Sequence, residues 1–176
     1  TEVPVINSQS VGMRSFFRTG AYSRITAQYH HINEFRRGGD MLDRPPHEAL
    51  IAEQIDHSID GGSLSFDISS PDRRNRFNAY ASFQNTARKS YYGSKQDPDA
   101  YGTTHDLTVA AGMQYIHEFR KLLFMPSELT FGTEYSYDDL GDRSIGYDIH
   151  TDQTVHIVGA YLQNEWKTRK WSLLDR

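Results

Sequence analysis

The stretch Arg76-Phe77-Asn78-Ala79-Tyr80-Ala81-Ser82-Phe83-Gln84 decides the fold class of this chain. Apolar Phe and Ala side chains occupy every second position, and Asn, Tyr, Ser and Gln lie between them. Because successive side chains of a strand point to opposite faces, this period of two predicts a half-buried β-strand. The same alternation returns at residues 25–29, 63–69 and 107–115. We therefore predict an all-β chain.

The breaks between these segments predict an antiparallel up-and-down meander of about eight strands. Short polar turns near residues 20–23, 70–75, 120–127 and 168–170 alternate with longer connections at 38–57, 93–105 and 138–152. In a meander, all short turns then lie at one end and all long connections at the other, as in transmembrane β-barrels. We expect a short loop helix over residues 47–55. The expected strands are 11–19, 24–37, 58–70, 76–92, 106–119, 128–138, 153–167 and the start of one at 171.

The length of these strands points toward a membrane. Residues 24–37 and 76–92 contain no Pro and no interior Gly. Strands of soluble proteins most often have about 5–6 residues, whereas a tilted strand needs about 9–11 to cross a bilayer. Aromatic residues also gather near the expected strand ends, as in the interfacial girdles of outer-membrane barrels. Alternation alone does not tell whether the apolar face meets lipid or a protein core, so a soluble β-barrel or β-sandwich ligand-binding module remains the alternative.

Composition excludes several classes of protein and site. The chain has 176 residues, a net charge of −4 and no cysteine, which excludes disulfides, thiolate metal sites and thiol nucleophiles. Its basic residues are scattered rather than clustered, so no nucleic-acid partner is expected. No run approaches the ~20 consecutive apolar residues of a membrane helix, which excludes a helical membrane protein.

Five passages carry a more specific signal than alternation. They are 27–40 (AQYHHINEFRRGGD), 45–49 (PPHEA), 90–93 (SYYG) followed by 97–102 (DPDAYG), 122–130 (LLFMPSELT) and 162–167 (LQNEWK). These passages, spread over almost the whole chain, resemble the barrel of TonB-dependent outer-membrane receptors, the energy-coupled importers of Gram-negative bacteria.

The resemblance implies a transmembrane barrel of roughly 22 strands that is closed by a separate N-terminal plug. Residues 1–176 would then be a partial β-barrel domain, an internal fragment that lacks the plug domain and the remaining strands. The implied function is TonB-energised uptake of a scarce nutrient, such as an iron-siderophore, haem or cobalamin, across the cell outer membrane of a Gram-negative bacterium. The implied partners are a small-molecule nutrient or metal chelate, the TonB energy transducer acting through the absent plug domain, and outer-membrane lipid.

No motif in the sequence predicts catalysis. The eight His residues include no His-x-x-x-His pair, and adjacent His30 and His31 project to opposite faces of a strand. The sequence contains no Gly-x-Ser-x-Gly and no glycine-rich phosphate loop. We therefore expect no catalytic residue, no metal site and no cofactor, and the protein is not expected to be an enzyme.

Six residues on or beside the long connections are candidate ligand contacts. Guanidinium groups there could meet an anionic ligand, the imidazole of a Pro-Pro-His-Glu segment could contact a ligand, and tyrosines could form an aromatic contact surface. Solubilising charges, rigid Pro-Pro packing and girdle anchoring are the structural alternatives. The candidates are Arg36, Arg37, Arg44, His47, Tyr92 and Tyr101.

Overall fold

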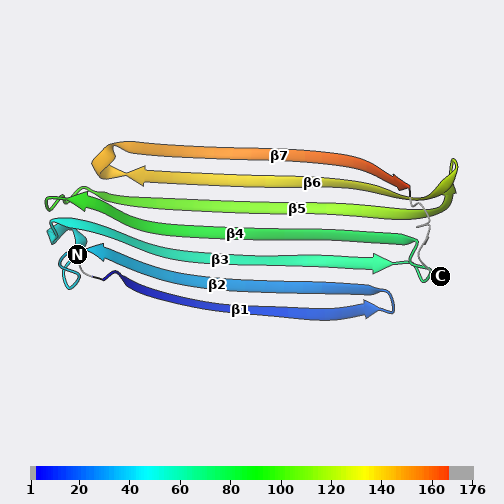
Figure 1. Cartoon of the computed structure of the whole chain (residues 1–176), viewed down its shortest axis with the longest axis horizontal. Helices are drawn as coiled ribbons and strands as arrows, with labels where there is room; N and C mark the ends of the chain where they lie inside the picture. The colour runs from blue at the N-terminus through cyan, green and yellow to red at the C-terminus, as the bar shows by residue number, and fades with distance from the viewer. Residues whose placement is uncertain (1–2, 167–176) are drawn as a thin grey trace, which may run out of the picture.

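A computed structural model describes residues 3–166, which form one open antiparallel sheet (Figure 1). The strands pair in chain order, β1 to β7, so each lies beside its neighbours in sequence. They are β1 (Val5–Gly20), β2 (Ser23–Gly39), β3 (Ile51–Ser69), β4 (Asn75–Ser94), β5 (Tyr101–Leu122), β6 (Met125–Ser144) and β7 (Ile149–Trp166). The predicted all-β antiparallel meander is confirmed. Seven strands are present in the described residues, and the strand start expected at residue 171 lies outside them.

The strands are longer than the alternation predicts, with 16 to 22 residues each. The three long connections are therefore shorter than expected from the sequence. They comprise residues 40–50, 95–100 and 145–148, and together they define the loop end of the sheet. The turns at 21–22, 70–74 and 123–124 define the opposite, turn end. The strands continue through glycines and charged residues because neighbouring strands satisfy their backbone groups, as where Gly39 pairs with Ala52.

The helix expected over residues 47–55 is wrong. Only η1 (Pro46–Glu48) forms a 3₁₀ turn, and β3 already begins at Ile51. Residues 52–55 pair with β2 on one side and with β4 on the other. Backbone pairing with two neighbouring strands therefore overrides the weak helical spacing of the apolar residues. A second 3₁₀ turn, η2 (Ile145–Tyr147), connects β6 to β7.

One face of the sheet carries an apolar belt. Directly paired residues of antiparallel strands point to the same side, so the register places Leu64, Ala81 and Ala111 in one row across β3, β4 and β5. Four consecutive rows of this kind make up the belt, and their members on β5 are Val109, Ala111, Met113 and Tyr115. Its apolar members are Met13, Phe17, Ile25, Ala27, Tyr29, Leu64, Phe66, Ile68, Phe77, Ala79, Ala81, Phe83, Val109, Ala111, Met113, Tyr115, Phe131, Tyr135, Tyr137, Val158, Ala160 and Leu162.

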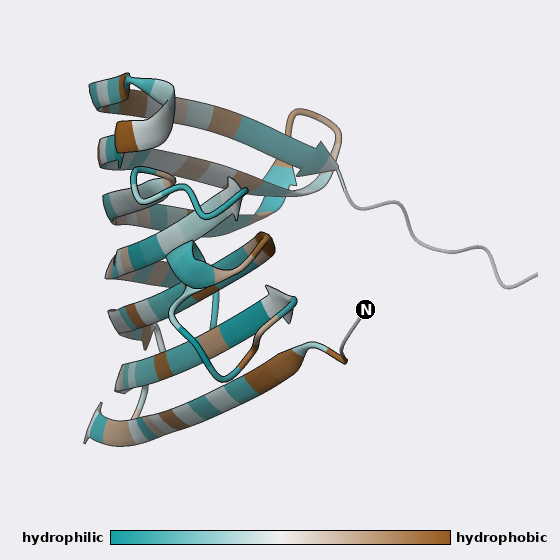
Figure 2. Cartoon of the chain, turned by 90° about the vertical axis from the view of Figure 1, so that its left-hand side faces the viewer, coloured by the Kyte–Doolittle hydropathy of each residue, from teal (hydrophilic) through white to brown (hydrophobic). Residues whose placement is uncertain are grey.

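The opposite side, called the polar face below, carries mostly Ser, Thr, Gln and charged side chains at the same heights. One row contains Arg14, Gln28, Ser63, Ser82, Ala110 and Ser136. Figure 2, viewed from the loop end, shows the strands as a single curved layer in which hydrophobic and hydrophilic residues alternate along each strand. The period of two seen in the sequence is thus a division between two chemically different faces.

Two glycines on the polar face admit tyrosine rings from the neighbouring strand. Tyr80 lies opposite Gly112, and Tyr161 lies opposite Gly132. A methyl group added to Gly112 would lie 2.8 Å from the Tyr80 ring, and one added to Gly132 would collide with Tyr161. Each ring therefore covers the bare backbone of a glycine, an arrangement that fixes the register of sheets.

Candidate functional site

All six candidate ligand contacts lie at the loop end, because the meander returns the chain there after every second strand. The sheet nevertheless divides them between its two sides. Arg37 and Tyr101 are in one row on the side of the apolar belt, together with Tyr91, whereas Arg36 and Tyr92 point to the polar face. Arg44 is exposed on the β2–β3 connection, and His47 lies within η1.

Arg37 holds the β2–β3 connection in place. Its side chain is only 2% exposed, and it donates hydrogen bonds to the carbonyl oxygens of Gly38 (2.8 Å) and Asp40 (3.3 Å). Burying a guanidinium group is costly unless its charge is met by such acceptors. The position of Arg37 is therefore that of a structural residue, and its predicted role in ligand contact stays untested.

Tyr91 is the centre of the small buried cluster at the loop end. It is 1% exposed and packs with Ala49, Ala52 and Ala100. Its hydroxyl donates to the carbonyl oxygen of Asp97 at 2.8 Å. Burial, with a smaller contribution from Asp97, raises the pKa of the Tyr91 hydroxyl. This cluster fastens the connections 40–50 and 95–100 to the sheet.

His47 and Tyr101 belong to the same packed region. His47 Nδ1 and the Tyr101 hydroxyl lie 2.8 Å apart, and the ring of Tyr101 meets the edge of Tyr91 with centroids 4.9 Å apart. Pro46 beside His47 is buried, which fits the expected rigid packing of the Pro-Pro segment. The two side chains are therefore engaged with the protein itself.

The polar face at the loop end is more open. There Arg36 is paired with Glu34, Nε to Oε1 at 2.8 Å, and its guanidinium remains more than half exposed. Tyr92 is 40% exposed and borders an open hollow of about 910 Å³. Of the six candidates, Tyr92 alone lines this hollow.

Sequence analysis missed the other residues that shape the hollow. Glu53 and Ile51 reach it from β3, Asp97 from the β4–β5 connection and Tyr147 from η2. The Tyr147 hydroxyl lies 3.4 Å from the carbonyl oxygen of Tyr92, so η2 leans across β5 toward the end of β4. No local sequence pattern predicts that these residues lie together, because the hollow joins segments about 50 residues apart.

A row of paired charges crosses the polar face nearer the belt. It contains Glu34, His57, Arg88, Thr104 and Asp142 on β2 to β6. Arg88 Nε donates to Thr104 Oγ1 at 3.1 Å, the Thr104 hydroxyl donates to Asp142 at 2.5 Å, and Arg88 lies 3.7 Å from Asp142. The row carries charge of both signs, so it favours water and polar solutes without selecting one sign.

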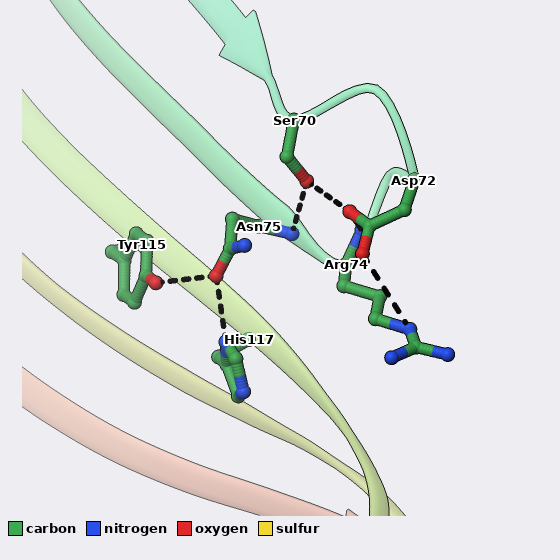
Figure 3. A network of polar contacts seen from close by, with 6 residues as sticks. All are labelled: Ser70, Asp72, Arg74, Asn75, Tyr115 and His117. Atoms are coloured by element: carbon green, nitrogen blue, oxygen red, sulfur yellow. Dashed lines mark hydrogen bonds and ion pairs between the residues drawn. The ribbon is translucent and has the colours of Figure 1, made fainter.

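The turn end is held by one connected polar network, in which the Asn75 backbone N–H donates to the Ser70 hydroxyl oxygen at 3.0 Å (Figure 3). In the β3–β4 turn, Asp72 Oδ1 accepts the Ser70 hydroxyl at 2.5 Å and the Arg74 backbone N–H at 3.1 Å. The hydrogen bond from Ser70, followed by that from Arg74, lowers the pKa of Asp72. Beside the turn, Asn75 Oδ1 lies 2.7 Å from the Tyr115 hydroxyl and 2.6 Å from His117 Nδ1.

Neither a metal centre nor a helical membrane span is found within residues 3–166. No three His, Asp or Glu side chains in this range are placed to hold an ion. No helix in it is long and apolar enough to cross a membrane. Comparisons of the chain with protein-family models, curated proteins and solved structures return no match. Function therefore has to be inferred from the faces and ends of the sheet.

Proposed function

We propose that residues 3–166 form part of the wall of a transmembrane β-barrel in the outer membrane of a Gram-negative bacterium. The observation that carries this proposal is the apolar belt, which crosses all seven strands in adjacent rows. Its large side chains are exposed, with 54% of Leu64, 47% of Met113 and 77% of Val158 accessible. A continuous exposed apolar surface needs a partner, and lipid is the partner that fits a belt on one face of a β-sheet.

The height of the belt is about two thirds of the apolar band of an outer-membrane barrel. Its four rows, from Val109 to Tyr115 on β5, span about 20 Å along a strand that rises about 3.4 Å per residue. A strand tilt of about 40° reduces this to about 16 Å, against an apolar band of about 25 Å in outer-membrane barrels. The belt would therefore lie within the hydrocarbon layer.

Tyrosines border the belt in the orientation expected at a membrane surface. At the turn-end border, the Tyr115 hydroxyl points away from the belt to Asn75. At the loop-end border, the Tyr29 hydroxyl donates to Asp60 in the next row, and the Tyr135 hydroxyl of the second row lies 2.9 Å from His156 in the border row. A ring in lipid with its hydroxyl among polar groups is typical of interfacial girdles.

A self-contained soluble module is a weaker interpretation. Within residues 3–166 the buried apolar cluster is Ala49, Ala52, Tyr91 and Ala100, with Pro46 buried beside it at the loop end, and the belt has no protein layer over it. A soluble β-barrel or sandwich would bury its apolar face against a second sheet. The polar face, with its cross-strand charges, suits a water-filled lumen instead.

We further propose that the protein is a TonB-dependent receptor that takes up a scarce nutrient such as an iron-siderophore, haem or cobalamin. Support comes from the sequence resemblance and from the shape of the wall: β2 continues about ten residues beyond Tyr29 at the border of the belt, to Gly39. Such an extension would present the loop end to the medium. Seven strands would supply about a third of a roughly 22-stranded barrel, whose plug would contact the energy transducer.

The absence of cysteine from the sequence makes the membrane proposal directly testable. Single cysteines at Ala79 and Ala81 on the belt, and at Asn78 and Ser82 on the polar face, would be introduced into the protein in intact outer membranes. A membrane-impermeant maleimide should label Asn78→Cys and Ser82→Cys and spare the two belt positions. Equal labelling of both sets would refute the membrane wall.

Energised uptake needs a separate experiment. Cells carrying the full-length protein would be grown on a limiting nutrient with and without the TonB transducer. Growth that depends on both the protein and the transducer supports the receptor. Growth that persists without the transducer would leave a membrane barrel with a passive role.

A further inference from the structure

The hollow at the loop end has a one-sided charge. Among the described residues that line it are two carboxylates, Glu53 and Asp97, and no Lys, Arg or His. Arg36 on the neighbouring strand is occupied by Glu34 at 2.8 Å. A ligand carrying negative charge would therefore meet carboxylates in this hollow without a compensating cation.

The Glu53 side chain is available to a ligand. It is exposed, and within residues 3–166 it makes no hydrogen bond or ion pair. Asp97 differs, because its Oδ1 accepts the backbone N–H of Asp99 at 2.9 Å and its carbonyl oxygen accepts the Tyr91 hydroxyl. Asp97 is thus fixed by the loop, and Glu53 is the free acceptor on the floor of the hollow.

Two tyrosines supply aromatic surface beside these carboxylates. Tyr147 is 63% exposed and Tyr92 is 40% exposed. The contact of the Tyr147 hydroxyl with the Tyr92 carbonyl connects η2 to the end of β4. The close approach of Gly146 to the Asp99 carbonyl, where an added methyl would lie at 2.8 Å, connects η2 to the β4–β5 connection. The two rings are therefore held on the same rim.

Exposed tyrosine rings next to an unpaired carboxylate are the groups that bind organic cations. The ring face attracts a cation through its quadrupole, and the carboxylate supplies a charge-assisted contact. Ile51, 67% exposed beside Glu53, offers apolar contact to the rest of such a ligand.

We propose that the hollow binds the ammonium end of a small organic cation, with Glu53 as its counter-ion and Tyr92 and Tyr147 as its aromatic wall. As a statement about the receptor's nutrient, this inference rests on the proposed function. It narrows the nutrient to one that presents a cationic group at the loop end rather than an anionic ferric chelate. As a statement about binding, it can be tested without transport.

The test uses three probes of similar size and different charge: benzyltrimethylammonium, benzyl alcohol and benzylsulfonate. Binding to the full-length protein in non-ionic detergent would be measured by isothermal titration calorimetry and by saturation-transfer NMR. We expect the cation to bind at least tenfold more tightly than the neutral probe, and the anion not to bind.

Two substitutions on β3 provide a matched pair. Glu53→Gln removes the proposed counter-ion and should weaken binding of the cation about tenfold. Asp56→Asn removes another exposed carboxylate of the same strand, three residues on and on the opposite face, and should leave binding unchanged. Tyr147→Ala should weaken binding several-fold, and Tyr147→Phe should weaken it less, because the ring that meets the cation remains while the hydroxyl contact with the Tyr92 carbonyl is lost.

The outcomes separate this inference from the proposed function. Cation binding that is lost in Glu53→Gln and kept in Asp56→Asn supports the site, whatever the cysteine labelling shows. Equal affinity for all three probes, preference for the sulfonate, or no effect of Glu53→Gln overturns it. If labelling supports the membrane wall while these binding results fail, only the ligand class is wrong.

Discussion

Placing one charge on either side of the sheet tests whether the apolar belt faces lipid. Ala81 lies in the second row of the belt, between Leu64 and Ala111, and the next residue, Ser82, points to the polar face. Ala81→Arg and Ser82→Arg therefore add the same group to the same strand at nearly the same height. They differ only in the face that receives the guanidinium.

The expected magnitudes follow from the height of Ala81. The four rows of the belt are centred between the rows of Ala111 and Met113, so Ala81 lies about 3 Å from the centre along the strand. Arg near the midplane of a barrel costs about 2–4 kcal/mol of folding free energy. Ser82→Arg places its charge between Ser63 and Ala110, in the row that also holds Gln28 and Arg14, where a surface substitution changes stability by about 0.5 kcal/mol or less.

The assay is reversible urea unfolding of the full-length protein in phospholipid vesicles, followed by tryptophan fluorescence. The belt proposal expects Ala81→Arg to lower the free energy of unfolding by at least about 1.5 kcal/mol relative to Ser82→Arg. The wild-type protein without lipid or detergent serves as the control and should not fold. Equal destabilisation by the two variants, or cooperative folding of the wild type in plain buffer, would refute the reasoning and favour a soluble β module.

Three further predictions concern the turn end, the loop end and the register. Asp72→Asn should lower the free energy of unfolding at neutral pH and have no effect in acid. The fold lowers the pKa of the Asp72 carboxyl. The stabilisation by the Asp72 carboxylate is therefore present above the ordinary Asp pKa of about 3.9 and disappears as the pH falls through the lower pKa of the folded state. A difference from wild type that stays constant between about pH 5 and 2 would contradict this. Arg37→Met should leave the Gly38 and Asp40 carbonyls without their donor, cost about 1–3 kcal/mol and speed thermolysin cleavage in the 40–50 connection. Unchanged cleavage would show that Arg37 does not hold the loop. Gly132→Val should displace the Tyr161 ring and lower the free energy of unfolding in urea by about 1–3 kcal/mol. Gly159→Val should lower it by less, because a Cβ added at Gly159 meets nothing within 4 Å. A larger loss of stability in Gly159→Val than in Gly132→Val would contradict packing of the ring on Gly132.

Residue patterns along the chain were enough to predict the strands and the order in which they turn. Alternation at 76–84 and 107–115 assigned each side chain to a face, because a strand leaves no freedom in that respect. The same rule separates Arg36 from Arg37 and Tyr91 from Tyr92. The alternating short and long breaks predicted which strand ends lie together. All six candidate residues lie at the loop end because they are on or beside the long connections, which all lie there.

The ends of the strands and the groups that cover each face depend on contacts between distant segments. Ile51 to Ile55 look helical in isolation, but β2 and β4 offer hydrogen-bonding partners on both sides, so this segment becomes a strand. Burial of Arg37 depends on a connection that folds back over it, and the hollow at Glu53 depends on η2 reaching the end of β4. These contacts join residues that are distant in sequence, and their energies depend on packing and charge around each group. Local sequence patterns reflect only the preferences of neighbouring residues, so they do not predict these contacts.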